Sequence, residues 1–450
     1  MTARSRPADI PMAPGGLPGI GHAPALLRDS HAFLTSLPAH GDLVRIRLGP
    51  DRAVVVCTPE LTQRVLRDDK VFDKGGALFD RIREWLGDGL GTCAHHRHRR
   101  QRRLIQPAFH HTRMPGYGET MTAGIDEVTR GWADGQVLDM PGEMGALSAR
   151  IAVQTMFRDA LPPDALRQAV DDVTAVVRGL YLRASAPAVV AELPLPGHRR
   201  LRRARARLRG IVTTIVAERR ASGADRGDLL SALLAARDLD GDGRGLSDAE
   251  IGDQVLTFFA SGLETTALAL VWALRLLAFH PDAERRVRAE ADAVLAGGPA
   301  EFGHLSELEF TRRVVTEVLR LFPPAGEMFT RTTTRDTELG GRRIRAGTTI
   351  VYSSCLIHHR GDLYEDPARF DPDRWDRASR PQPPREAFLP FGGGARKCIG
   401  DQFALAEVVL GLATIVARWS VRPERAPRRH PRTVAQWRRL GDRMRVTRIR

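Results

Sequence analysis

The sequence has few cysteines and no long hydrophobic run, and both shortages restrict what the protein can be. Its 450 residues include only 4 cysteines, which are scattered and form no CxxC pair, so a disulfide framework or a structural zinc site is not expected. No segment approaches the roughly 18–20 uncharged apolar residues that span a bilayer. Residues 1–14 also lack the apolar core of a signal peptide. We therefore expect a cytoplasmic protein without a membrane anchor.

Acidic residues are outnumbered, and this imbalance makes nucleic acid the first partner to consider. The chain has 68 Lys+Arg against 54 Asp+Glu, a formal charge of +14. However, the basic residues are mostly arginines spread along a composition rich in Ala, Gly and Leu, as a GC-rich genome produces. No zinc finger, basic zipper or aromatic RNA-binding signature accompanies the charge. We expect no specific binding of nucleic acid.

Strands are few and helices many. Residues 42–57 predict a hairpin around Gly49-Pro50-Asp51, and a second strand-rich stretch covers residues 339–352. Helical periodicity covers much of 120–235 and nearly all of 247–321, and Pro194, Pro196 and Gly197 mark a loop between two helices. No repeat or low-complexity linker interrupts the chain. The pattern predicts a mainly α fold with a small β subdomain, in a single domain over residues 1–450.

The helix over about residues 247–279 is unusually long. Ser247 and Glu250 form a capping box, and His280-Pro281 ends the helix after a span of about 50 Å. Its middle is apolar, so it is expected to cross the interior. Residues 261–266 place a polar cluster inside it, which calls for an explanation.

Residues 391–400 combine a glycine-rich turn with a cysteine just before a predicted helix over 403–417. Glycines let a backbone approach a flat ligand without Cβ clashes. The positive end of a helix favours the thiolate of Cys398 over the thiol, and a thiolate is the form that ligates iron. The alternative is a small buried cysteine that follows a loop.

This segment resembles the haem-binding pattern FxxGxRxCxG of the cytochrome P-450 family. The matching residues are Phe391, Gly394, Arg396, Cys398 and Gly400. The resemblance implies the P-450 fold, with a long central helix over haem b and residues 391–400 as the haem-ligand loop. It also implies Cys398 as the ligand of the iron, and dioxygen as co-substrate.

Two further segments resemble family motifs. Glu317 and Arg320 share a helical face over about residues 311–321, and the family likeness implies that both lock with Arg374 in a buried charge network. Taken alone, this spacing is typical of a solvated ion pair. In the long helix, Glu264 and Thr265 resemble the acid–alcohol pair that delivers protons to bound oxygen. The alternative for the threonine is a hydroxyl bonded to a carbonyl of its own helix.

The family likeness also implies contacts for the haem propionates and the substrate. Propionate contacts are expected from His98, Arg102, Arg331 and Arg396, where His98 stands in place of the family's tryptophan. Segments 72–90 and 176–196 are expected to help enclose the substrate. The residues expected to line the pocket are Phe258, Phe259, Ala260, Leu263, Met328 and Phe329.

Together with the family likeness, these observations predict a haem-dependent monooxygenase that activates dioxygen and hydroxylates or further oxidises an unactivated C–H bond of a small hydrophobic substrate. The amino-acid sequence of residues 102–109 resembles that of actinobacterial family members that oxidise terpenes. A sesquiterpene of secondary metabolism is therefore the expected substrate. A polyketide, fatty-acid or steroid hydroxylase, a peroxygenase, and a gas sensor or carrier without turnover remain alternatives.

No flavin or iron–sulfur domain fits after Cys398, so electrons are expected from NAD(P)H through a separate ferredoxin and ferredoxin reductase. The cationic helix at residues 97–103, with Lys397, is the expected docking face. We expect a monomer.

Overall fold

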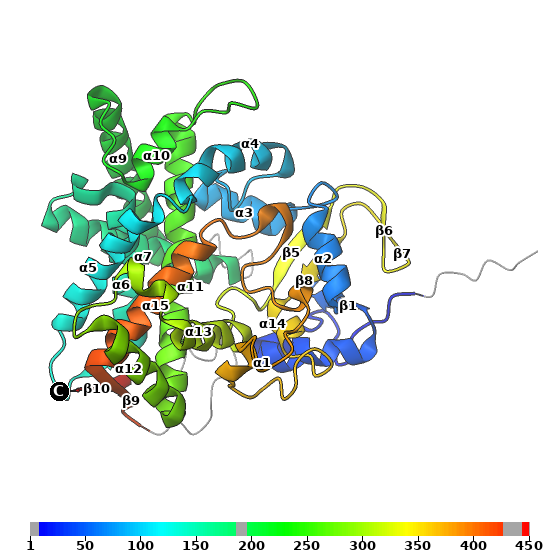
Figure 1. Ribbon diagram of the computed structural model, residues 1–450. Helices are drawn as coiled ribbons and strands as arrows, with labels where there is room; N and C mark the ends of the chain where they lie inside the picture. Colours follow the sequence, from blue (N-terminus) through cyan, green and yellow to red (C-terminus); the bar gives the residue numbers. More distant parts are fainter. Residues whose placement is uncertain (1–8, 186–195, 426–442, 450) are drawn as a thin grey trace, which may run out of the picture. The chain divides into compact units, whose positions relative to one another are not determined.

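Helices form most of the chain that the computed structural model describes (Figure 1). The described residues are 9–185, 196–425 and 443–449. Their contacts divide them into unit 1, residues 9–76 and 316–398, and unit 2, residues 77–185, 196–315, 399–425 and 443–449. The predicted mainly α fold with a small β part is confirmed, whereas the single domain over residues 1–450 stays a prediction.

A five-stranded sheet is the framework of unit 1. The strands of this unit are β1 Leu43–Leu48, β2 Asp51–Val56, β3 Phe72–Asp73, β5 Phe329–Thr333, β6 Thr337–Leu339, β7 Arg342–Ile344 and β8 Thr349–Tyr352. The sheet order is β1-β2-β8-β5-β3, in which only β2 and β8 run parallel. The predicted hairpin over residues 42–57 is β1 and β2, and β6 and β7 pair on either side of Gly340-Gly341. Both predictions are confirmed.

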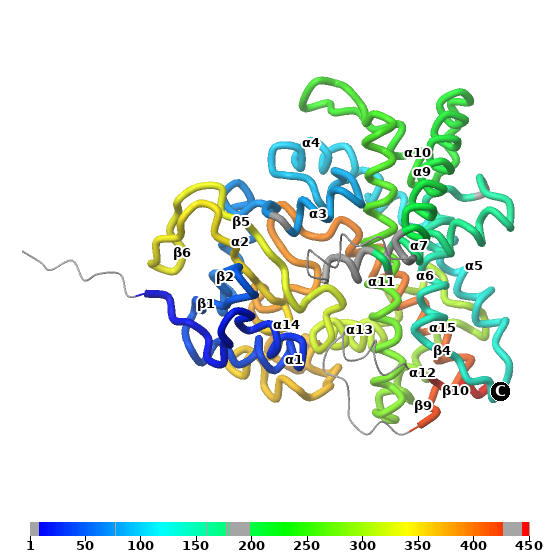
Figure 2. The backbone as a smooth tube through the Cα atoms, turned by 180° about the vertical axis from the view of Figure 1, so that it is seen from behind, coloured from blue at the N-terminus to red at the C-terminus, as the bar shows by residue number. Residues whose placement is uncertain are grey.

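Apolar side chains on both faces of this sheet form two clusters. Val54 and Val56 of β2 pack in one cluster with side chains of α2, whereas Val55 packs in the other with side chains of α1 and α14. Successive residues of a strand point to opposite faces, so an almost uniformly apolar strand is covered on both sides. Figure 2 shows α1 beside α14. The helical segments are α1 Ala23–Ser36, η1 Leu37–His40, α2 Pro59–Arg67, α14 Ser354–His358, η5 Pro372–Trp375, η6 Arg385–Ala387 and η7 Gly394–Arg396.

Unit 2 is mainly helical. Its longer helices are α3 Gly76–Leu86, α4 His95–Ile105, α5 Met114–Arg130, α6 Met140–Phe157, α7 Pro163–Ser185, α9 Pro196–Ser222, α10 Leu229–Ala235, α11 Asp248–Phe279, α12 Pro281–Leu295 and α15 Asp401–Arg418. Its 3-10 turns are η2 Gln106–Phe109, η3 Arg158–Ala160 and η4 Phe302–Ser306. A small antiparallel sheet has the order β4-β10-β9, with β4 Val137–Asp139, β9 Trp419–Pro423 and β10 Arg443–Arg448. Helix α13, Glu309–Leu321, begins in unit 2 and ends in unit 1.

The long helix predicted over residues 247–279 is α11. Ser247 is its N-cap, and the capping box is complete: Glu250 N donates to Ser247 Oγ at 3.3 Å, and Ser247 N donates to Glu250 Oε2 at 2.8 Å. The helix ends at Phe279, before His280 and Pro281, as predicted. It packs most extensively against α6, and the two helices lie together in both views (Figures 1 and 2).

Helix α11 is also long and apolar enough to cross a membrane by length and composition, although the sequence analysis expected no such segment. In the structure, 72% of its most apolar window is buried inside the protein, as in the core helix of a globular fold. The loop predicted at residues 194–197 lies mainly outside the described residues. Within them, α7 ends at Ser185 and α9 begins at Pro196, so Pro196 starts a helix.

A buried carboxyl group joins two helices of unit 2. Glu407 on α15 is buried, and Ser148 on α6 donates a hydrogen bond of 2.7 Å to its Oε1. Burial raises the pKa of Glu407 from 4.5 to about 8, while the hydrogen bond from Ser148 acts in the opposite direction. The folded protein therefore keeps this group protonated at neutral pH, whereas the unfolded chain ionises it.

Replacing this group by an amide should stabilise the protein in a pH-dependent way. The folded state of the wild type binds one more proton than the unfolded state between pH 4.5 and about 8, so its free energy of unfolding falls as pH rises through that window. Glu407→Gln removes this dependence and should gain on the order of 3 kcal/mol at neutral pH. Urea denaturation across the window measures the difference. The control is Glu307→Gln, which replaces an exposed glutamate. If the difference in free energy of unfolding between variant and wild type were independent of pH for Glu407→Gln, as it should be for Glu307→Gln, the buried proton would be contradicted.

Candidate functional site

The cysteine-containing segment ends unit 1 in a closed loop. Cys398 N donates a hydrogen bond of 3.0 Å to Phe391 O, and Lys397 N donates to Gly394 O at 3.2 Å across η7. These bonds hold the two ends of the loop together just before the cysteine. Gly400 follows as the N-cap of α15 in unit 2.

Gly394 is required by the backbone of a neighbouring helix. Its φ is +65°, in the left-handed region, and a Cβ atom on it would lie 2.0 Å from Leu66 O and 2.6 Å from Leu66 C of α2. Gly392 has nearly the same φ, +67°, but a Cβ atom there would meet nothing within 4 Å. The motif glycine therefore sets how closely the loop packs on α2.

Burial separates Cys398 from the other cysteines. All four lie in the described residues; no disulfide joins them, and only Cys398 is exposed. Burial raises the pKa of Cys57 and of Cys355 to about 12, so these two remain thiols at neutral pH when no cation is bound to them. Cys398 is therefore the most accessible of the four cysteines, and its role as ligand of the iron stays a prediction.

Two buried arginines of unit 1 carry positive charge close to the loop. Arg396, whose side chain is 1% exposed, donates from Nη2 to Asp73 Oδ1 at 2.6 Å, and its Nε lies 3.3 Å from Asp69 Oδ2. Arg331 donates from Nη2 to the hydroxyl of Tyr352 at 3.2 Å. Burial raises the pKa of Tyr352, and the charges of Arg331 and Arg396 oppose that rise, which places both guanidinium groups near the phenol. Sequence reasoning singled out both arginines but missed the two aspartates.

Helix α4 carries the other residues expected to meet propionates. His98 is buried, and Arg102, half-buried, donates from Nε to Gln106 Oε1 at 3.2 Å. The two residues are four apart, so they share one face of α4. Their role toward a cofactor stays a prediction.

Three cations of the predicted docking face are paired with carboxylates of unit 2. Arg97 donates from Nη1 to Asp88 Oδ2 at 2.5 Å. Arg100 donates from Nη1 to Glu250 Oε1 at 2.8 Å. Arg103 forms a two-pronged contact with Asp238, at 2.9 and 3.0 Å. These carboxylates offset part of the positive charge of the helix, and its role as a docking face stays a prediction. Arg99 of the same helix is exposed.

Glu317 is the centre of a buried network in unit 1. Arg320 donates to both of its carboxylate oxygens, at 2.8 and 2.9 Å, and both side chains are fully buried. Trp375 Nε1 and the Asp371 backbone N–H donate to the same carboxylate at 2.9 and 3.1 Å. Arg374 lies 3.5 Å from it. The structure thus brings together all three residues of the expected network, and it excludes a solvated pair.

His358 connects this network to the cysteine loop, and this role was not predicted. Burial lowers the pKa of His358 to about 3, so its imidazole is neutral. Leu389 N donates to Nε2 at 2.8 Å, which leaves Nδ1 to donate to Arg320 O at 3.1 Å. Arg320 also donates to the carbonyls of His358, Pro367 and Arg369. The chain that leads to residue 391 is therefore anchored to α13.

The polar cluster of α11 bonds to its own helix. Thr265 Oγ1 donates to Ser261 O at 2.6 Å, Thr266 Oγ1 to Gly262 O at 2.8 Å, and Ser261 Oγ to Thr257 O at 2.7 Å. The cluster was expected to be buried, but Ser261 is exposed and Thr265 is half-buried, as is Glu264. The alternative of a threonine bonded to a helix carbonyl describes the observed contact. Because that bond uses the hydroxyl hydrogen, the lone pairs of Oγ1 remain available to accept.

The residues expected to line a substrate pocket pack in apolar clusters of their own units. In unit 2, Phe258 contacts Phe109 edge to face at 5.5 Å between ring centroids, and Phe259 contacts Phe157 at 6.0 Å. Ala260 and Leu263 are buried in the same cluster. In unit 1, Phe329 stacks on Tyr352 at 5.1 Å, and Met328 packs on the cluster beside α1. Of the expected segment 176–196, residues 186–195 lie outside the described chain.

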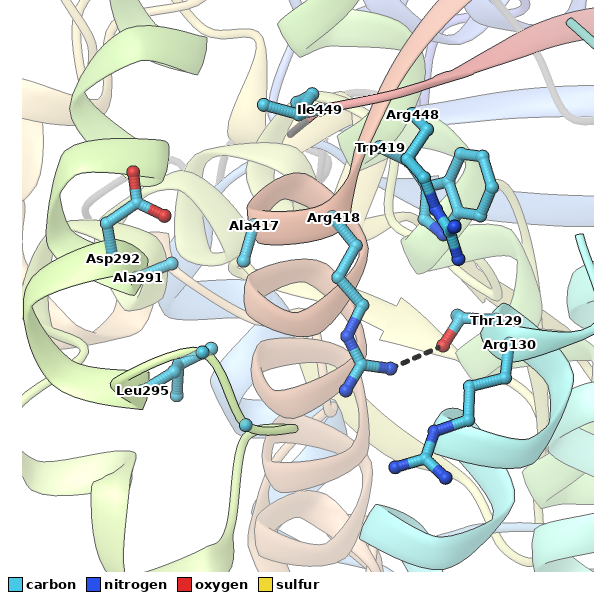
Figure 3. A pocket seen from close by; sticks show the side chains of 12 residues that line it. Thr129, Arg130, Ala291, Asp292, Leu295, Ala417, Arg418, Trp419, Arg448 and Ile449 are labelled. Carbon is cyan, nitrogen blue, oxygen red and sulfur yellow. Dashed lines mark hydrogen bonds between the residues drawn. The ribbon is translucent and has the colours of Figure 1, made fainter. Parts of the chain in front are cut away.

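A cavity of about 410 Å³ lies elsewhere in unit 2 (Figure 3). It is lined by residues that include Thr129, Asp292 and Trp419, and by Arg418, which donates to Thr129 Oγ1 at 3.2 Å. None of the residues expected to hold a cofactor or substrate lines it.

The comparisons with known proteins agree on one family. A sequence profile described as cytochrome P-450 matches residues 11–438. The chain is similar to cyclooctat-9-en-7-ol 5-monooxygenase of Streptomyces melanosporofaciens, 48% identical over 93% of this chain and 91% of that protein. It is similar to pentalenene oxygenase of Streptomyces avermitilis, 44% identical over 92% and 91%. Cyclooctatin synthase of Streptomyces melanosporofaciens is 44% identical over 94% and 92%.

The two glycines of the loop provide a matched pair for testing its geometry. Gly392→Ala should cost about 1–2 kcal/mol, because only the left-handed φ opposes the new side chain. Gly394→Ala should cost clearly more, because the same penalty is joined by a clash with a backbone carbonyl that cannot rotate away. Urea denaturation of both variants measures the difference. Equal losses would show that the approach of α2 does not fix the loop.

Proposed function

The chain belongs to the cytochrome P-450 family, and from this premise we propose that it is a haem-thiolate monooxygenase that oxidises a C–H bond of a terpene. The observation that carries the proposal is the exposed Cys398 at the end of a loop that matches the family motif at each fixed position. The sulfur of Cys398 is proposed as the ligand of the iron.

The residues present fit a haem. A planar anionic macrocycle needs an accessible thiolate, a loop without bulky side chains and cations for two carboxylates. Cys398, Gly394 and Gly400 provide the first two, and Phe391 closes the loop through its carbonyl. We propose Arg331 and Arg396 as propionate contacts in unit 1. A guanidinium has five N–H donors, so Arg396 can keep Asp73 and still donate to a propionate. His98 and Arg102 are proposed for the same role from α4.

When bound, a thiolate-ligated haem supplies the activation of dioxygen and the oxidation of an unactivated C–H bond. The protein contributes the supply of protons. We propose that Thr265 Oγ1, whose hydrogen is directed to Ser261 O, accepts a hydrogen bond from a water molecule and orients it. Glu264, half-buried on the same helix, would pass protons from solvent to that water.

The substrate class rests on the relatives. One of them is named for cyclooctat-9-en-7-ol and another for pentalenene, and each match covers more than nine tenths of this chain. Phe258, Phe259, Ala260, Leu263, Met328 and Phe329 are proposed to provide the apolar surface for such a molecule, whose few polar atoms make burial favourable. A sesquiterpene stays the prediction for its size. Polyketide, fatty-acid and steroid substrates lack comparable support.

The chemistry requires electrons, and the family implies redox partners. We propose NAD(P)H as the source, with a ferredoxin reductase and an acidic ferredoxin as carriers. The exposed cations of the predicted docking face, Arg97, Arg99, Arg103 and Lys397, are proposed to meet the ferredoxin. The monomeric state and the cytoplasmic location stay predictions.

Cys398→Ser should abolish thiolate ligation. The wild type, reduced and exposed to carbon monoxide, should show the strongly red-shifted Soret band of thiolate-bound haem, and the variant should lose it. Cys57→Ala removes a buried thiol of the same unit and should keep the band. Circular dichroism establishes that each variant is folded. A wild type that is folded and contains haem without this band would overturn the proposal.

Thr265→Ala should separate electron consumption from product formation. With pentalenene or cyclooctat-9-en-7-ol as substrate and a surrogate ferredoxin system, product formed per NADPH consumed should fall severalfold, because proton delivery typically contributes 10²–10⁴-fold to a rate. Ser261→Ala is the matched control, since it removes the hydroxyl one turn earlier on the same face and leaves the carbonyl that Thr265 bonds. An unchanged ratio in Thr265→Ala would exclude the proposed role of Thr265, whereas a wild type that forms no product from either substrate would favour a carrier or sensor.

A further inference from the structure

Unit 1 contains a second group of metal-ligand side chains, separate from Cys398. His31 of α1, Cys355 of α14 and His359 at the C-cap of α14 offer one ligand atom each, all within 4.8 Å of one another. His31 Nδ1 lies 3.1 Å from Cys355 Sγ, and His359 Nδ1 lies 3.9 Å from the same sulfur. The two imidazole rings meet edge to face at 4.4 Å. Residues 324 positions apart in sequence are thus gathered at one point.

The hydrogen bonds around these rings suit metal ligation. His359 Nδ1 donates to the backbone carbonyl of Cys355 at 2.9 Å, which leaves the lone pair of Nε2 for an ion. A ligating histidine typically donates its other ring N–H to a carbonyl in this way. Cys355 is buried, but both histidines are half-buried, so an ion can reach the sulfur from the histidine side.

The charges nearby also favour a cation. Ser30, next to His31, donates to Glu327 Oε2 at 2.9 Å, which fixes that carboxylate beside the cluster. A carboxylate held beside a cluster of ligand atoms favours a dication at the same place.

We propose that His31, Cys355 and His359 bind one zinc ion. A thiolate with two imidazoles is a donor set that suits Zn²⁺, in tetrahedral geometry, with water in the fourth position. Binding forms a zinc–sulfur bond and breaks the S–H bond of Cys355, whose proton passes to water. An N···S separation of roughly 3.5 Å is expected around tetrahedral zinc, so His31 and Cys355 move apart by only a few tenths of an ångström. The scattered cysteines led us to expect no structural zinc site. Cysteine spacing does not indicate the proposed site, because it uses a single cysteine and its ligands come together only in the fold.

The ion would join α1 to α14. Apolar packing, with Leu34 of α1 and Leu356 of α14 in one cluster, already holds the two helices together. An ion that binds the folded state and not the unfolded chain stabilises the fold, so the melting temperature should rise with the concentration of free zinc. The site is proposed as structural, and it is independent of the haem proposal.

The test uses the haem-loaded protein, stripped of loosely bound metal and dialysed against buffered micromolar zinc. Mass spectrometry of the metals should give about one more zinc ion per chain in the wild type than in His31→Gln. Zinc K-edge absorption should show a sulfur scatterer at about 2.3 Å, which iron does not obscure. The zinc affinity of Cys355→Ser and of His31→Gln should be reduced at least about tenfold.

His40→Gln replaces an exposed histidine of the same unit and should bind zinc as the wild type does. If Cys355→Ser does not fold, His31→Gln, whose ring is half-buried, carries the comparison, and circular dichroism verifies its fold. Equal zinc content in the wild type and His31→Gln, or a zinc edge without sulfur, would overturn the proposal. Either result would leave the carbon monoxide band of Cys398 unaffected.

Discussion

The carboxylate of Glu317 is the constraint on which unit 1 depends. A fully buried charge is stable only when its lone pairs are occupied, and here Arg320, Trp375 and the backbone of Asp371 occupy them. Arg320 in turn satisfies three carbonyls between residues 358 and 369. Loops that run without regular structure obtain from this one ion pair the hydrogen bonds that a helix or strand would otherwise supply. The neutral His358 accepts a hydrogen bond from the backbone N–H of Leu389, two residues before Phe391, and so connects the network to the cysteine loop.

The environment gives three thiols of unit 1 three different characters. Cys57 is an apolar core residue, and Cys355 is a buried thiol whose neighbours are two imidazoles and nearby carboxylates. Cys398, at the end of a loop held by backbone hydrogen bonds, is the one that is exposed. The residue type alone does not decide the chemistry of a sulfur atom; burial and the sign of nearby charge decide how readily it ionises and what can reach it.

Features set by neighbours in sequence could be predicted, and those set by distant residues could not. The capping box of α11 and the hairpin of β1 and β2 depend on a few consecutive residues, so their patterns sufficed. The pairing of Glu317 with Arg374 came from resemblance, since no local rule joins residues so far apart. Asp69, Asp73 and His358 were missed because their roles exist only after folding. The strands β4, β9 and β10 were missed because their partners are remote in sequence. The pairing of Arg103 with Asp238 was missed because the two residues lie 135 positions apart in sequence.

A motif residue can be needed for folding or for the chemistry of the cofactor, and Gly394 is needed for folding. Its place is dictated by the carbonyl of Leu66 and by a left-handed backbone, neither of which involves an iron atom. A descendant of this protein that had abandoned oxygen chemistry would therefore still need glycine at that position to fold, while position 398 would be released to vary. When such degenerate relatives are sought in genomes, the glycine reports ancestry and architecture, and the cysteine alone reports whether the catalyst survives.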